Sequence, residues 1–180
     1  RISKVFHYMY NPFNEVFETR GVKLEDIKRN YQDLLPNIKN WIGVDYHKTL
    51  EKSEFLNLKF SRPSHSIDMI SGFDTRSIDV KNGRFFSNRD IEILETLFWP
   101  FMKLYGYTEV TEKDFYQNLK KIKPLIREPL DIELKYFSNF ENDYINIKET
   151  SSFRLLHQNL LNAWNTLDQN MTYPYLIKKL

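Results

Sequence analysis

The chain has 180 residues, of which 41% are apolar, 28% charged and 16% aromatic, and its formal net charge is +2 at pH 7. These values predict a folded domain with a core and exclude a disordered or low-complexity segment. The near balance of 26 basic and 24 acidic residues argues against nucleic-acid binding, and the lack of cysteine excludes disulfides, thiolate nucleophiles and cysteine-bound metals.

The spacing of glycine and histidine excludes further classes of site. No two of the five glycines are closer than eleven residues. A Walker A loop has the form G-x-x-x-x-G-K-S/T and a dinucleotide fingerprint the form G-x-G-x-x-G, so neither exists here. The four histidines are far apart, so we expect no metal site.

The chain carries no sign of membrane insertion or export. No apolar run approaches the roughly 18 residues of a membrane span. Residues 1–10 lack the small-residue cleavage site of a signal peptide. We therefore expect no membrane span and a cytoplasmic location.

Residues 22–43 predict a short strand followed by helix. The strand is expected at residues 22–24, and apolar residues then recur every three or four positions over residues 27–42. Pro36 leaves two forms open: two short helices, or one helix that starts at this proline. Gly43 is expected to end the helical segment in the left-handed conformation.

A long irregular segment separates this region from the clearest helix. Residues 45–86 show no sustained periodicity, and a loop of that length is usually functional or ordered by a ligand. Ser87 and Asp90 then form an S-x-x-D capping pattern, which predicts a helix that Gly106 terminates.

The remainder predicts further helices. Thr111 and Asp114 repeat the capping pattern, a helix is expected over residues 130–140, and Ser151 begins a last helix that ends before Tyr173. The predicted fold class is therefore mainly α.

Three segments, in order, resemble the sulfotransferase family. Residues 21–44 (GVKLEDIKRNYQDLLPNIKNWIGV) resemble its stretch of a strand, E-D-L, a helix and F-L-G-I. Residues 53–57 (SEFLN) resemble its T-x-F turn, and residues 87–107 (SNRDIEILETLFWPFMKLYGY) resemble its closing helix, which ends in G-Y. The resemblance covers about residues 20–107.

The resemblance implies the C-terminal helical part of an α/β fold. Sulfotransferases of this type have a parallel sheet flanked by helices, as in P-loop kinases, and bind the donor 3′-phosphoadenylyl sulfate (PAPS). Their P-x-S-G-T-T phosphate loop, their R-D-P…S segment and their catalytic His have no match in this chain. We therefore expect residues 1–110 to be the C-terminal half of such a domain and residues 111–180 a helical extension.

The resemblance also implies which residues would bind the nucleotide end of PAPS or of its product PAP. Ser53 and Phe55 stand at the T-x-F positions that line the adenine pocket, with the aromatic ring on the base. The family often has a second adenine contact, a Tyr before E-D, where this chain has Leu24. The alternative is a surface turn at Ser53 and a core position at Phe55.

The loop before the closing helix has the basic residues that grip the donor's 3′-phosphate in the family. Here these are Arg76, Lys81, Gly83 and Arg84, and Gly83-Arg84-Phe85 fits the G-R-W form of bacterial members. A phosphate dianion favours a guanidinium fork and backbone N–H groups at a glycine turn. The alternative is a solvated basic loop.

Other chemistry-bearing residues have structural interpretations. Glu25 and Asp26 are adjacent, so on a strand their carboxylates would point apart and could not share a proton. Trp41 and Trp99 are expected in the core. His65, between two serines, would serve as a general base only with an Asp-His-Ser register that the chain lacks.

The prediction for function is transfer of a sulfuryl group from PAPS to an acceptor hydroxyl or amine, without a metal. The phosphate loop and catalytic base would come from a missing N-terminal half or a partner chain, so the chain alone should be inactive. The alternative is a non-catalytic helical interaction module that docks a partner or a second copy. A glycosyltransferase-like or kinase-like enzyme fits the three segments less well.

Overall fold

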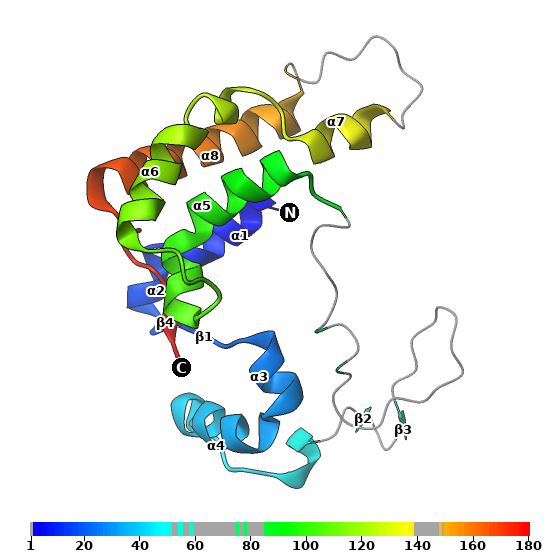
Figure 1. The fold of residues 1–180 in the computed structure, drawn as a ribbon. Helices are drawn as coiled ribbons and strands as arrows, with labels where there is room; N and C mark the ends of the chain where they lie inside the picture. The colour runs from blue at the N-terminus through cyan, green and yellow to red at the C-terminus, as the bar shows by residue number, and fades with distance from the viewer. Residues whose placement is uncertain are drawn as a thin grey trace. The chain divides into compact units, whose positions relative to one another are not determined.

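The computed structural model describes residues 2–51, 54–55, 58–59, 75, 78, 85–138, 148 and 150–180. Over these residues the chain is mainly helical, as predicted, with eight α-helices and four strands of two residues each (Figure 1). It divides into two compact units. Unit 1 comprises residues 1–20 and 81–179, and unit 2 comprises residues 21–80 and Leu180.

The helices of unit 1 come from both ends of the chain. They are α1 (Ile2–Met9), α2 (Phe13–Val16), α5 (Asn88–Tyr105), α6 (Glu112–Ile122), the 3₁₀ helix η3 (Leu125–Arg127), α7 (Asp131–Ser138) and α8 (Ser151–Asn170). Unit 2 contains α3 (Leu24–Arg29), α4 (Tyr31–Ile42), the 3₁₀ helix η1 (Lys48–Glu51), β2 (Glu54–Phe55) and β3 (Leu58–Lys59). In the two small sheets, β1 (Arg20–Gly21) pairs with β4 (Lys178–Lys179) and β2 pairs with β3.

The helix boundaries of unit 1 follow the predicted capping residues. The Ser87 hydroxyl accepts a hydrogen bond from the Asp90 amide at 3.1 Å, and the Thr111 hydroxyl accepts one from the Asp114 amide at 3.2 Å. Gly106 ends α5 in the left-handed conformation with φ of 68°. These contacts satisfy backbone groups that a helix end leaves open.

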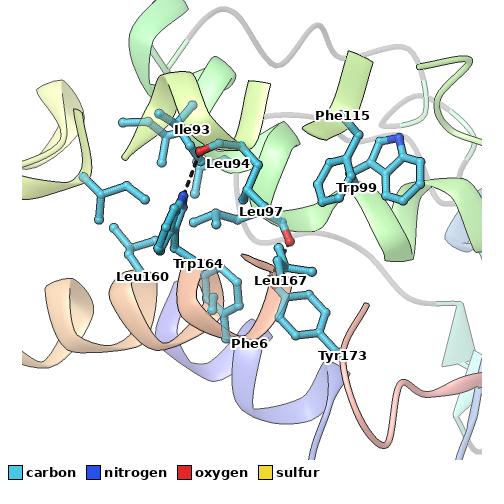
Figure 2. Close-up of a cluster of buried hydrophobic side chains, with 14 of the residues drawn as sticks. Phe6, Ile93, Leu94, Leu97, Trp99, Phe115, Leu160, Trp164, Leu167 and Tyr173 are labelled. Atoms are coloured by element: carbon cyan, nitrogen blue, oxygen red, sulfur yellow. Dashed lines mark hydrogen bonds between the residues drawn. The ribbon is translucent and has the colours of Figure 1, made fainter. Parts of the chain in front are cut away.

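One hydrophobic core joins α1, α5, α6 and α8 (Figure 2). Phe6 of α1 stacks on Phe98 of α5 with ring centroids 4.6 Å apart. The indole Nε1 of Trp164 in α8 donates to the Leu119 carbonyl of α6 at 2.7 Å. Burying each large apolar side chain contributes about 1.5–3 kcal/mol, so these contacts hold the segments of unit 1 together.

Near Pro100 in α5, a backbone carbonyl accepts a hydrogen bond from the C-terminal segment. Pro100 has no N–H, so it cannot donate to the Thr96 carbonyl one turn earlier. The Tyr173 hydroxyl donates to the neighbouring Leu97 carbonyl at 2.6 Å. The C-terminal segment is thereby hydrogen-bonded to the middle of α5.

Unit 2 corrects two sequence predictions. The strand expected at residues 22–24 is wrong: Leu24 already begins α3, whose first turn carries Glu25 and Asp26, and acidic side chains favour a helix N-terminus. Both forms expected at Pro36 are wrong: Pro36 lies inside α4, and the break between the two helices falls at Asn30, with a non-helical φ of −124°. Gly43 ends α4 with φ of 75°, as predicted.

Burial differs between the two units. Trp99 in unit 1 is 5% exposed, so its predicted core position is confirmed. Trp41 in unit 2 is 41% exposed, so its predicted core position is wrong. No residue of α3 or α4 is buried by the described part of the chain, and an apolar helix face without a covering layer cannot form a core.

Unit 1 runs across the predicted boundary at residue 110. That boundary follows the extent of the sulfotransferase resemblance and stays a prediction. In the structure α5 packs on α6 and on α8 within the same unit. Over the described residues, no helix combines the length and apolar character needed to cross a bilayer.

Candidate functional site

The residues predicted to hold the nucleotide are largely outside the described structure. Phe55 alone has a described backbone: it lies in β2, antiparallel to β3, with Leu58 as its partner. The other predicted site residues lie outside the described ranges: Ser53, His65, Arg76, Lys81, Gly83 and Arg84. The nucleotide site therefore stays a prediction.

A cluster of polar side chains joins the start of α5 to the start of α7. We call Ser87, Arg89, Asp90 and Asp131 the α7 clasp. The Asp90 carboxylate is fully buried, and its two oxygens accept hydrogen bonds from the amides of Asp131 at 2.8 Å and Ile132 at 2.9 Å. Asp90 therefore caps a helix that begins more than forty residues later.

The Arg89 guanidinium completes the α7 clasp. Its Nη1 donates to the Pro129 carbonyl at 2.9 Å and to Asp131 Oδ1 at 3.1 Å. Its Nη2 donates to the Leu125 carbonyl at 2.8 Å and to the Glu128 carbonyl at 3.3 Å. Since both terminal nitrogens are engaged by protein acceptors, Arg89 serves the fold rather than a phosphate group.

Glu133 adds a titratable group beside the α7 clasp. Its Oε2 accepts a hydrogen bond from the Leu130 amide at 2.9 Å. Burial raises the pKa of Glu133, and the nearby Asp90 charge acts in the same direction, while the bond from Leu130 opposes the shift. Three carboxylates, those of Asp90, Asp131 and Glu133, thus lie near the start of α7, and each accepts hydrogen bonds from the chain itself.

The sequence analysis missed the role of the α7 clasp. It assigned Asp90 to the cap of its own helix, and the Asp90 amide does bind Ser87. The carboxylate, however, binds amides 41 and 42 positions away. A local pattern contains no signal for partners at that separation.

One cavity of about 260 Å³ lies between α5 and α6. Its wall includes the buried rings of Trp99 and Phe115, and its polar groups come from both helices and from the turn between them. The lining residues are Asn88, Ile91, Glu92, Glu95, Thr96, Trp99, Thr108, Val110, Phe115 and Asn118.

A second cavity of about 430 Å³ lies beside η3 and α7. Its charged residues are paired with one another: Lys148 Nζ lies 2.7 Å from Glu128 Oε2, and Arg89 binds Asp131. The hydrogen bond from Lys148 lowers the pKa of Glu128. The remaining lining residues are prolines and leucines, so the cavity presents no unpaired charge.

Neither a metal centre in the described residues nor a related protein identifies a functional site. Within the described ranges, no three His, Asp or Glu side chains come together in a form that could hold a metal ion. No protein-family model, curated protein or solved structure matches this chain.

Proposed function

We propose that the chain is the C-terminal part of a PAPS-dependent sulfotransferase and holds the nucleotide end of the donor. The observation that carries the proposal is where the helices of the resembling segments begin and end. Glu25 and Asp26 lie in the first turn of α3, Gly43 ends α4, and α5 runs from the Ser87 cap to Gly106. These residues of the resembling segments thus lie at helix boundaries, which supports the proposal, although the strand that opens the family's stretch is not formed at residues 22–24.

The lack of burial in unit 2 also supports the proposal. The apolar side chains of α4 recur on one face, yet the described residues bury none of them. Leu24, Trp41 and Ile42 are all exposed. A helix pair of this kind is stable when its apolar face packs against another layer, which in the family is the parallel sheet of the other half.

The proposed chemistry divides between this chain and the missing half. Ser53 and Phe55 would contact the adenine, while Arg76, Lys81, Gly83 and Arg84 would bind the 3′-phosphate. In the transfer, the acceptor oxygen or nitrogen bonds to the donor sulfur, the sulfur–oxygen bond to the phosphate breaks, and PAP leaves. The base that takes the acceptor proton would belong to the missing half, and no metal is required.

The test is stabilisation of the 180-residue chain by PAP, measured by thermal unfolding. A ligand supplied at roughly 100 times its Kd raises the free energy of unfolding by about 2.7 kcal/mol, equivalent to about 5–10 °C for a chain of this size. Adenosine 5′-phosphate, which lacks the 3′-phosphate, should stabilise the chain less.

Two substitutions make the test specific. Arg84→Ala should remove most of the difference between PAP and adenosine 5′-phosphate without changing the melting temperature of the free chain. Arg154→Ala, at an exposed arginine of α8, should leave the PAP effect unchanged. Equal stabilisation by both nucleotides, or none by either, contradicts the proposal.

A second candidate is a non-catalytic helical interaction module, and the exposure of α2 favours it. Phe13, Val16 and Phe17 are 60%, 71% and 68% exposed. Asn14, between them, donates to the Tyr175 carbonyl at 2.9 Å, which holds this segment to the end of the chain. A fixed group of exposed apolar side chains is typical of an interaction surface.

PAP also separates the two candidates. An interaction module should be indifferent to PAP, and its mass in solution should rise with concentration if a second copy docks on α2. Val16→Asp should then restore the monomer. If PAP stabilises the chain and the chain stays monomeric at every concentration, only the sulfotransferase proposal remains.

A further inference from the structure

The cavity between α5 and α6 has a rigid aromatic wall. Trp99 and Phe115 stack with ring centroids 4.2 Å apart and an interplanar angle of 10°. The Trp99 indole Nε1 donates to the Val110 carbonyl at 2.9 Å, which fixes the orientation of the ring. The wall is therefore formed before any ligand binds, so little ordering is needed on binding.

The polar groups of this cavity lie on one face of α5 and on α6. Asn88, Glu92 and Glu95 follow one another at i, i+4 and i+7, so they line one side of the helix. Glu92 pairs with Lys121. Glu95, like the amides of Asn88 and Asn118, has no hydrogen bond or ion pair with any part of the chain that the structure describes.

Among the carboxylates that line the cavity, Glu95, which is exposed to solvent, has no ion pair within the described residues. Lys121 balances Glu92, and Lys103, which lies over the Trp99 ring, pairs with Glu112 at 3.0 Å. What remains is the Glu95 carboxylate, which only accepts hydrogen bonds, and two side-chain amides, which can accept as well as donate. Such a set favours a ligand with one positive charge and N–H donors, and disfavours an anion.

The volume restricts the ligand further. About 260 Å³ equals roughly nine water molecules' share of liquid volume. Cavities that hold drug-sized ligands span about 300–1,000 Å³. The cavity is thus of a size to enclose a short aliphatic group.

We propose that this cavity binds a small primary ammonium compound. The ammonium group donates to the Glu95 carboxylate and to an amide oxygen, and the apolar part of the ligand lies against Trp99 and Phe115. The site is independent of the donor nucleotide discussed above, because it uses none of the same residues.

The test is a titration of the full chain, followed by NMR at the indole N–H of Trp99, with Trp41 and Trp164 as internal controls outside the cavity. The probes are n-pentylammonium, pentan-1-ol and pentanoate. Pentylammonium should shift the Trp99 signal saturably with a Kd on the order of 1 mM. Pentanol should bind about tenfold more weakly, because it lacks the charge-assisted hydrogen bond, and pentanoate should not bind.

Substitutions test whether Glu95 supplies the negative charge that binds the ammonium group. Glu95→Gln should weaken pentylammonium binding about tenfold and make it similar to pentanol binding. Glu109→Gln, at an exposed glutamate outside the lining, should leave it unchanged. The proposal is overturned if pentanol binds as well as pentylammonium, if Glu95→Gln binds like the unmodified chain, or if all three tryptophan signals shift together.

Discussion

Two buried tyrosines of unit 1 use their hydroxyl groups differently. Tyr173 donates to the Leu97 carbonyl at 2.6 Å and stacks on Tyr10 with ring centroids 4.4 Å apart, and burial raises its pKa well above the usual value. Tyr105 is just as buried, yet its hydroxyl has no hydrogen-bond partner among the described residues. Burial likewise raises the pKa of Tyr105.

This contrast predicts opposite responses to the same substitution. Tyr173→Phe should lower the free energy of unfolding by about 1–1.5 kcal/mol, because the Leu97 carbonyl loses a buried donor. Tyr105→Phe should be neutral or stabilising, because it removes a hydroxyl that is desolvated without a partner. Urea unfolding of both variants measures the difference. A loss at Tyr105 equal to that at Tyr173 would mean that a residue outside the described ranges binds the Tyr105 hydroxyl.

Residues with local roles could be predicted from sequence, and residues with distant partners could not. Ser87, Thr111 and Gly106 act within one turn of their own helix, so a pattern of a few letters identifies them. The exposure of Trp41 depends on whether another layer covers α4, which no local pattern records. Glu95 is exposed, as its place on a polar helix face predicts, and only the packing of α6 on α5 makes it line a cavity.

Among the secondary-structure elements, the helices after residue 87 were predicted, whereas α1 and α2 were not. The last helix, α8, begins at Ser151 as expected, with the Thr150 hydroxyl accepting from the Phe153 amide at 3.2 Å. In α1 the apolar repeat of Ile2, Val5, Phe6 and Met9 spans only two turns, and α2 is a single turn, so neither gives a sustained helical pattern. Those short helices are held by tertiary contacts, such as that of Phe6 in the core, rather than by propensity.

The hydrogen bonds from Asp90 that attach α7 to α5 can be tested by substitution. Asp90→Ala should lower the free energy of unfolding by about 2–4 kcal/mol, because two amides at the start of α7 lose a buried charged acceptor. Asp114→Ala removes the corresponding, exposed capping residue of α6 and should cost about 1 kcal/mol. Hydrogen exchange should show the loss in α7 for Asp90→Ala alone. Equal costs at the two sites would contradict a special role for the α7 clasp.

On the scale of the whole molecule, the C-terminal segment supplies most of the core of unit 1. Of the fifteen buried residues in the described cluster, ten lie beyond residue 110. They come from α6, η3, the start of α7, α8 and Tyr173. The segment that the resemblance leaves unassigned therefore shares one hydrophobic core with α5.

A truncated chain tests this dependence. Residues 1–110 alone should show weak helical circular dichroism and no cooperative thermal transition, because α5 would expose Ile93, Leu97 and Trp99. The full chain should unfold cooperatively. A cooperative transition of the fragment would instead identify residues 111–180 as a separable extension.

The two-part origin of unit 1 also has a consequence on the ribosome. Asn14 donates to the Tyr175 carbonyl, 161 positions later, and α1 packs on α8. At about 5–20 residues per second, the nascent chain keeps the apolar face of α1 uncovered for roughly 7–30 s before α8 emerges. A premature stop codon within α8 would make that exposure permanent.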